Sequence, residues 1–405
     1  MENNDPKVTF SRKNVLPAFL GIIIGAGILL AIMMLLQPKL MNNALIFSFA
    51  DVMAGCAEGS FFYQVMWVLE DLSEGTFMVS IPGTVCLVVF ALVAAYLEKK
   101  KSAHMGSGVD GNHRILWKMI LCAIVALIIG LLVYGPSTFA TYGWIPTFAA
   151  FLSVQVLIVH FGATPAKLVT ITILGALITF PCSLFFLHFV VNPLGIPLFC
   201  CVAFGLVVAV PVCSEILRLL PWMKQADPAP APSAEDDLPA PPPMSENKFF
   251  FHRVFGDIGE LVVWGSSLSI IAMYVGVIIS WVLNPLHPAY SMGNLPMMIF
   301  AQITTAALAI FIWYPKWKKN GWAFTFASVV FSSAVIITYT NHWLVVALTI
   351  IIGAIIFAPL IDWMLKTFNK KGRWHVLFYI QIAIGLCVAI WSLILKHGLI
   401  PLLGA

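Results

Sequence analysis

The sequence predicts an all-α polytopic membrane protein, and its composition, the length of its apolar runs and their continuity all indicate this class. Of the 405 residues, 60% are hydrophobic and 10% are charged, whereas soluble domains carry about 25% charged residues. Many runs reach the roughly 20 apolar residues that a helix needs to span a bilayer. The runs are continuously apolar rather than alternating, which argues against a transmembrane barrel.

Eleven apolar segments are expected to form transmembrane helices. The first comes after Lys7, Arg12 and Lys13, as the apolar region of a signal peptide comes after basic residues. It is too long for a signal peptide, and no small-residue cleavage site follows it, so we interpret it as a retained helix. The eleven segments cover residues 15–36, 77–97, 116–134, 144–160, 168–189, 198–220, 261–283, 295–314, 322–339, 343–365 and 376–395.

The stretch 45–69 is either a twelfth helix or a re-entrant segment that enters and leaves on the outer face. Lys and Arg cluster in alternate loops, and such loops stay in the cytoplasm. Eleven spans keep the basic N-terminus inside, whereas twelve place it outside, so we prefer eleven. In either case we expect the acidic end of this stretch, Glu70, Asp71 and Glu74, to be exposed to water.

Charge and composition divide the chain into four parts. Residues 1–14 form a cytoplasmic tail, and residues 15–224 form a first membrane bundle. Residues 225–252 are rich in Pro, Ala and acids, a composition typical of a disordered cytoplasmic linker. Residues 253–405 form a second bundle, and the C-terminus then lies in the periplasm.

An internal pseudo-repeat is suggested by two pairs of short matches. "GWIPTFA" at 143–149 and "GWAFTFA" at 321–327 agree at five of seven positions. Pro211 with Glu215, and Pro359 with Asp362, each place a proline and then an acid near a helix end. The expected topology puts the first pair on opposite faces and the second pair on one face, so the two hints conflict. Such repeats are common in secondary transporters.

Asp51 and Glu58 are the leading candidates for a proton or cation site. They are seven residues apart, so on a helix both project from one face, close to Gly55 and Gly59. An ionisable side chain within a membrane is costly and usually faces a cavity. The alternative is a solvated amphipathic hairpin at the membrane surface.

Further candidates for binding a solute or ion are polar residues in or near the apolar segments. Glu260 begins one such segment, where it alternatively stabilises a helix N-terminus. The uncharged candidates either line a hydrophilic path or hydrogen-bond between helices; they are Gln155, Ser266, Gln302 and Thr305.

No pattern in the sequence indicates a cofactor, a metal or a nucleic acid. The eight cysteines lie in apolar segments without CxxC spacing, and no Cys/His cluster has zinc-like spacing. P-loop, GxSxG and HExxH motifs are missing from the sequence.

The sequence therefore predicts a secondary active transporter, coupled to H⁺ or Na⁺, for a small polar solute in a bacterial inner membrane. The resemblance to transporters is one of general architecture only. One alternative is a membrane-embedded enzyme acting on a lipid-linked substrate. Another is a non-catalytic subunit of a membrane complex.

Overall fold

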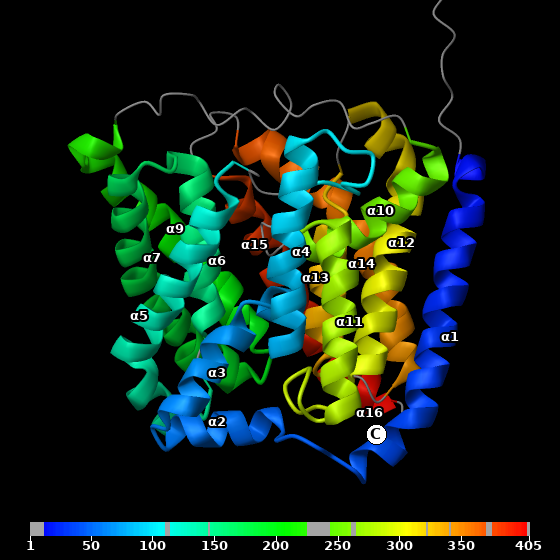
Figure 1. Ribbon diagram of the computed structural model, residues 1–405, viewed down its shortest axis with the longest axis horizontal. Coiled ribbons are helices and arrows are strands. Elements are labelled where there is room, and N and C mark those ends of the chain that lie inside the picture. Colours follow the sequence, from blue (N-terminus) through cyan, green and yellow to red (C-terminus); the bar gives the residue numbers. More distant parts are fainter. Residues whose placement is uncertain are drawn as a thin grey trace, which may run out of the picture.

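A computed structural model describes residues 12–109, 114–144, 146–224, 244–260, 265–320, 323–339, 342–369 and 375–402, and within these ranges the chain is helical (Figure 1). Most of the expected linker, residues 225–243, and the first eleven residues of the tail lie outside the described ranges. The principal helices are α1 (Leu16–Met41), α2 (Phe49–Ala57), α3 (Phe61–Asp71), α4 (Ile81–Lys99), α5 (Leu116–Tyr142), α6 (Thr147–Phe161), α7 (Pro165–Phe186), α9 (Phe199–Leu219), α10 (Glu246–Gly259), α11 (Ser267–Leu283), α12 (Leu295–Asn320), α13 (Phe326–Ile336), α14 (Trp343–Phe368) and α15 (Val376–Ile394).

Eight described helices are long and apolar enough to cross a bilayer, which makes the chain a membrane-embedded multi-pass protein. They are α1, α4, α5, α7, α9, α12, α14 and α15, with α7 and α15 extended by a π-helical turn and a short helix. Each of the eleven predicted segments contains a helix. However, α6, α11 and α13 have only 15, 17 and 11 residues. The positions of the helices therefore agree with the prediction, but these three are too short for their length alone to show that they cross the membrane.

The stretch 45–69 forms two short helices instead of one span. Gly59, with a left-handed φ of +78°, lies between α2 and α3 and breaks the helix, because only glycine adopts this conformation without strain. In Figure 1, α2 and α3 lie at the end of the molecule opposite α10. Neither helix, at 9 and 11 residues, is long enough to cross a bilayer.

Helices α4 and α11 run antiparallel and cross closely at the centre of the molecule (Figure 1). A Cβ atom added at Gly276 would lie 2.3 Å from the carbonyl oxygen of Pro82, and one at Gly83 would lie 2.6 Å from Val277 Cγ2. Small residues at such crossings let two backbones pack against each other in a membrane. The two parts of the chain on either side of the linker are thus packed together along this pair.

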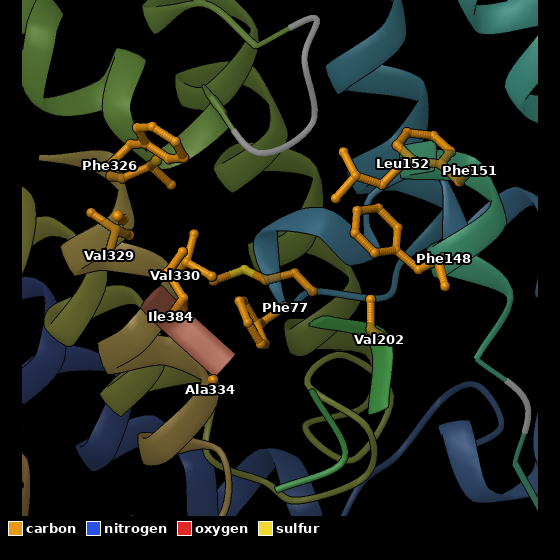
Figure 2. Close-up of a cluster of buried hydrophobic side chains, with 14 of the residues drawn as sticks. Phe77, Phe148, Phe151, Leu152, Val202, Phe326, Val329, Val330, Ala334 and Ile384 are labelled. Carbon is orange, nitrogen blue, oxygen red and sulfur yellow. The ribbon is translucent and has the colours of Figure 1, made fainter. Parts of the chain in front are cut away.

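The short helices α6 and α13 form the interior of the protein. Every residue of α13, and every residue of α6 from Thr147 to Ile158, is buried. Figure 2 shows Phe148 and Phe151 of α6 on one side of the core and Val330 of α13 on the other, with Phe77 between them. The polar side chains of these helices, such as Gln155 of α6 and Ser332 of α13, are therefore buried within the protein.

The α-helix is interrupted between α3 and α4, where a single 3₁₀ turn covers Glu74–Thr76, and this break is buried. Residues 71–80 all have little exposure, and Phe77 has a left-handed φ of 61°. Unwound backbone inside a membrane protein needs partners for its polar groups. Gln302 of α12 supplies one, because its Nε2 donates to the Thr76 carbonyl at 2.7 Å and to Ser333 Oγ at 3.1 Å. Tyr274 of α11 in turn donates to Gln302 Oε1 at 2.8 Å.

Candidate functional site

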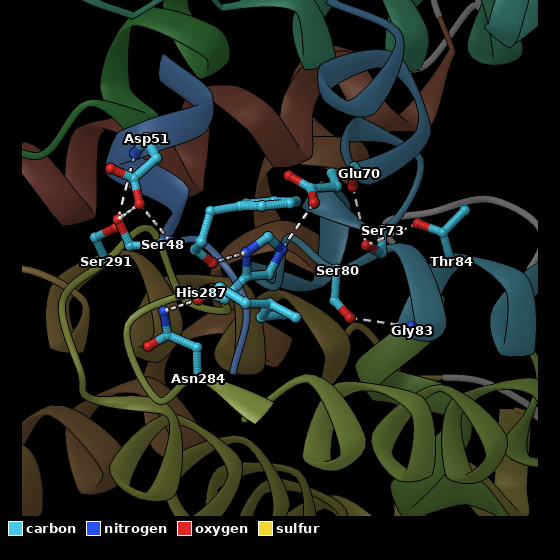
Figure 3. Close-up of polar contacts among 12 residues, drawn as sticks. Ser48, Asp51, Glu70, Ser73, Ser80, Gly83, Thr84, Asn284, His287 and Ser291 are labelled. Atoms are coloured by element: carbon cyan, nitrogen blue, oxygen red, sulfur yellow. Dashed lines mark hydrogen bonds and ion pairs between the residues drawn. The ribbon is translucent and has the colours of Figure 1, made fainter. Parts of the chain in front are cut away.

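Asp51 and Glu58 both lie on the exposed surface at the two ends of α2. Asp51 forms a capping box with Ser48, whose backbone N–H and hydroxyl donate to the Asp51 carboxylate at 2.7 and 2.8 Å (Figure 3). Such a box satisfies backbone donors at a helix N-terminus. Glu58 is the C-terminal cap residue of α2. Neither acid lines the cavity described below.

The acids that follow, Glu70, Asp71 and Glu74, are buried, so the expectation that they would be exposed to water was wrong. They are covered by the loop between α11 and α12, which lies in the other part of the chain, beyond the linker. His287 of this loop lies 2.7 Å from Glu70 Oε1 through Nε2, and its Nδ1 lies 3.1 Å from the Phe47 carbonyl oxygen (Figure 3). Burial by itself lowers the pKa of His287, but the hydrogen bond and charge of Glu70 outweigh burial and raise that pKa.

Asp71 and Glu74 form a hydrogen-bonded carboxyl pair in which both side chains are more than nine-tenths buried. Thr147, the first residue of α6, also hydrogen-bonds Asp71, and Trp67 Nε1 donates to Thr147 Oγ1 at 2.9 Å. Burial raises the pKa of Asp71 to about 6. Burial, and next the neighbouring Asp71, raise the pKa of Glu74 well above its ordinary value. Close carboxyl groups in a buried site share protons, because two adjacent negative charges are unfavourable there.

Two oxygens of this pair, Asp71 Oδ2 and Glu74 Oε2, are buried without a hydrogen-bond partner. The described residues place no Lys or Arg within ion-pair distance of either carboxyl group. Unpaired buried charge is strongly unfavourable, so the site needs protons or a cation. A proton or a cation at the carboxyl pair would remove this cost.

Glu74 forms part of the wall of a cavity of about 320 Å³. Small-molecule pockets are mostly apolar with a few polar groups, and their volumes start near 300 Å³. The wall has this character and comes from α2, the break after α3, α6, α9, the loop after α11 and the end of α13; it consists of Met53, Glu74, Gly75, Phe77, Trp144, Phe148, Ile196, Pro197, Leu198, Phe199, Val202, Tyr290, Met292, Ile337 and Thr338.

A second acidic cluster lies at the opposite end of the molecule, where α10 ends. Asp257 accepts a hydrogen bond from Thr325, the residue before α13, and Trp317 Nε1 donates to the same hydroxyl at 3.1 Å. The Arg253 guanidinium lies 2.6 Å from Asp257 and 3.1 Å from Glu260. Glu260, a predicted site residue, is therefore paired with an arginine and belongs to this cluster.

The four uncharged candidates occupy separate places in the core, and none of them lines the cavity. Ser266 caps α11 together with Ser269, and Gln302 supports the break after α3. Thr305 donates to Ser332 Oγ of α13 at 3.0 Å. Gln155 of α6 is fully buried, and neither atom of its amide has a partner.

The sequence contains one signal that points to Asp71 and Glu74. The pattern Asp-x-x-Glu followed six residues later by a helix-capping Ser occurs as Asp71, Glu74 and Ser80, and again as Asp257, Glu260 and Ser266. No protein-family model, curated protein or solved structure matched the chain.

Proposed function

We propose that the protein is a secondary active transporter that exchanges protons for a small solute at Asp71 and Glu74. The observation that carries this proposal is the position of Glu74, a buried carboxyl group with an unpartnered oxygen in the wall of a cavity of about 320 Å³. The cavity draws its wall from both parts of the chain, so relative movement of the two parts changes its shape and access.

The proposal is supported by an internal repeat that relates residues 61–219 to residues 246–402. Asp71, Glu74 and Ser80 correspond to Asp257, Glu260 and Ser266, and the number of residues between the two members is the same for each of the three pairs. The "GWIPTFA" segment at 143–149 corresponds to "GWAFTFA" at 321–327, and with the same separation "LGALITFP" at 174–181 corresponds to "IGAIIFAP" at 352–359. In the last helix of each half "AFGLVVAV" at 203–210 corresponds to "AIGLCVAI" at 383–390.

The matched glycines make the same kind of contact in the two halves. Gly175 of α7 packs against Ser153 and Val154 of α6, and Gly353 of α14 packs against Phe331 of α13. The number of residues from Ser153 to Phe331 equals the number from Gly175 to Gly353. The residues that correspond in sequence therefore also make corresponding contacts. The neighbour pairs among α5, α6, α7 and α9 also recur among α12, α13, α14 and α15.

Corresponding helices run in opposite directions (Figure 1). Thr147, at the start of α6, contacts α3, whereas Thr325, before α13, contacts α10 at the other end of the molecule. Inverted repeats of this kind permit alternating access, because each half can take the conformation of the other and so reverse the side on which the site opens. In this scheme α4 and α11 form the contact about which the halves move.

The conflict between the two sequence hints has a simple origin under this scheme. The correct counterpart of Pro359 in α14 is Pro181 in α7, which ends the matching "LGALITFP" segment, and not Pro211 in α9. Helices α9 and α14 run toward the same end of the molecule and are unrelated within the repeat (Figure 1).

Protons fit the site better than Na⁺ does. A hard metal cation prefers several oxygen ligands, whereas the cavity wall around Glu74 is mostly aromatic and aliphatic. The pKa of Asp71, raised to about 6 by burial, lies close to physiological pH, as a proton-exchanging group requires.

The basic residues orient the protein with α10 on the cytoplasmic side of a bacterial inner membrane. Lys99, Lys248 and Lys316 lie in the half of the molecule near α10, where Lys248 Nζ donates to the Ala103 carbonyl and Lys316 pairs with Asp362. The cavity, the helices α2 and α3 and the C-terminus then belong to the periplasmic half.

Transport is tested with purified protein in proteoliposomes that contain the pH dye pyranine. A panel of radiolabelled amines, amino acids and sugars is added outside under an imposed pH gradient. We expect at least one solute to accumulate with a matching proton flux. Both signals should be lost in Asp71→Asn and Glu74→Gln.

The matched control is Glu58→Gln, because Glu58 is exposed and outside the cavity. This variant should transport like the wild type. Uptake that ignores the pH gradient would contradict proton coupling. Loss of transport in Glu58→Gln together with full activity of Glu74→Gln would show that the transport site includes the surface acids and not the buried pair.

A further inference from the structure

The two acidic clusters differ in one respect that indicates which solute the cavity takes. In the second cluster Arg253 supplies a guanidinium group to the two carboxylates. Trp67 of α3 precedes Arg253 by as many residues as Asp71 precedes Asp257. In the repeat, Trp67 is therefore the counterpart of Arg253. The first cluster therefore keeps the two acids and the threonine of the second but lacks its cation.

The surroundings of Arg253 show what such a cluster binds. Its Nε donates to Asp257 Oδ1 at 2.7 Å, and its terminal nitrogen contacts Glu260 at 3.1 Å. Its guanidinium carbon lies 4.6 Å from the centre of the Trp317 ring. Paired carboxylates and an aromatic face are the usual partners of a guanidinium or ammonium group.

The first cluster offers similar groups, and one of its two acids, Glu74, faces an open cavity. Asp71 and Glu74 supply the carboxylates, and both Oδ2 of Asp71 and Oε2 of Glu74 lack a partner. Aromatic rings from Phe77, Phe148 and Tyr290 stand in the cavity wall beside Glu74. His287 does not supply the missing charge to this pair, because it is bound to Glu70 at 2.7 Å.

We propose that the cavity binds a small organic cation, a primary amine or guanidine with an apolar body, whose charged group supplies to Glu74 the positive charge that Arg253 supplies in the other half. The cationic group pairs with Glu74 in the cavity wall, where Asp71 is hydrogen-bonded to Glu74, and the apolar body lies against the aromatic wall. This proposal names the solute class of the transport function proposed above and rests on that function for its physiological meaning. The binding itself requires no gradient and no transport.

Binding is measured by isothermal titration and thermal shift on the full chain in detergent at pH 7.5. The probes are benzylguanidine, phenethylamine and butylguanidine, and the matched neutral and anionic compounds are benzylurea and phenylacetate. We expect at least one cation to bind and to raise the melting temperature. We expect its neutral isostere to bind at least about tenfold more weakly, because a buried charge pair is lost.

Three variants show whether binding depends on the carboxyl pair. Glu74→Gln should weaken binding of the cation by at least about tenfold, whereas Glu58→Gln should leave it unchanged. Trp67→Arg should abolish it by providing an internal guanidinium, and its elution on size exclusion shows whether it folds. Binding of benzylurea as tight as that of benzylguanidine would overturn the proposal, as would failure of all three cations to bind. Cation binding without proton-driven uptake would overturn the transport function alone.

Discussion

Arg253 contacts Asp257, one helical turn further along α10, at 2.6 Å, and the Asp257 side chain is fully buried. Removing one partner of a buried ion pair leaves an uncompensated charge, which costs about 3–5 kcal/mol. We expect Arg253→Gln to lower the free energy of unfolding by this amount at pH 8. The loss should shrink at pH 5, where Glu260, whose pKa burial raises to about 7, is protonated and less negative charge is left without a partner.

Arg218→Gln is the matched control for this change. Arg218 also pairs with an acid on its own helix, Glu215 at 2.8 Å, but both side chains are about one-third exposed or more. Exposed pairs contribute about 0–1 kcal/mol. Equal losses for the two variants in thermal unfolding would show that Arg253 does not hold a buried acidic cluster.

Protonation of Asp71 predicts a pH dependence of stability. Its pKa in the folded protein is raised from 3.8 to about 6 by burial, so the folded state binds a proton that the unfolded chain has already lost. Stability should therefore rise as pH falls from 7 through 6 toward 4, since protons then favour the folded state. Melting temperatures from pH 8 to pH 4.5 test this, and Asp71→Asn should flatten the profile. A wild-type profile that falls with acid over this interval would contradict the raised pKa.

The crossing of α4 and α11 predicts an unequal response to added side chains. Gly276→Val should prevent folding, because the first added carbon would lie 2.3 Å from the Pro82 carbonyl oxygen, a backbone atom that cannot move away. Gly27→Ala in α1 should be neutral, since nothing lies within 4 Å of an added Cβ there. Yield of monodisperse protein after size exclusion measures both. A folded Gly276→Val protein would show that the helices do not approach as described.

Gln302 is expected to be the most sensitive of the four uncharged polar residues named from the sequence. Gln302→Met removes the partners of the Thr76 carbonyl and of the Tyr274 hydroxyl, both of which are buried. Each buried polar group left unpaired costs about 1–3 kcal/mol. Thr305→Val should cost less, because Ser332 keeps its bond to the Val329 carbonyl. Denaturant unfolding in detergent compares the two, and a larger loss for Thr305→Val would refute this ranking.

Much of the fold was predictable because apolar length and continuity determine where membrane helices form. All eleven predicted segments contain helices, whereas the break of the stretch 45–69 at Gly59 was not predicted. The short length of α6, α11 and α13 was not visible in the sequence. Their flanking residues are also apolar, so a hydropathy pattern cannot mark where the helix itself ends.

The candidate site was harder to predict, because burial of Glu70, Asp71 and Glu74 depends on residues far away in the chain. An acidic run beside a helix end normally indicates a solvated turn. Here His287 and Tyr290 cover it from a loop in the other part of the chain. Asp51 and Glu58 had the spacing of a site, but α2 lies at the surface and leaves both exposed.

The central claim is that a cation and protons compete for Asp71 and Glu74. Measuring the protons released when a ligand binds tests this claim most directly. Benzylguanidine, or whichever probe cation binds most tightly, is added to the purified protein in weakly buffered detergent at pH 7. The released protons are counted with a pH dye against the amount of ligand bound. Exchange at a shared carboxyl pair predicts close to one proton per cation. The double variant Asp71→Asn/Glu74→Gln should release none. Cation binding without proton release, or equal release from the double variant, would contradict the account.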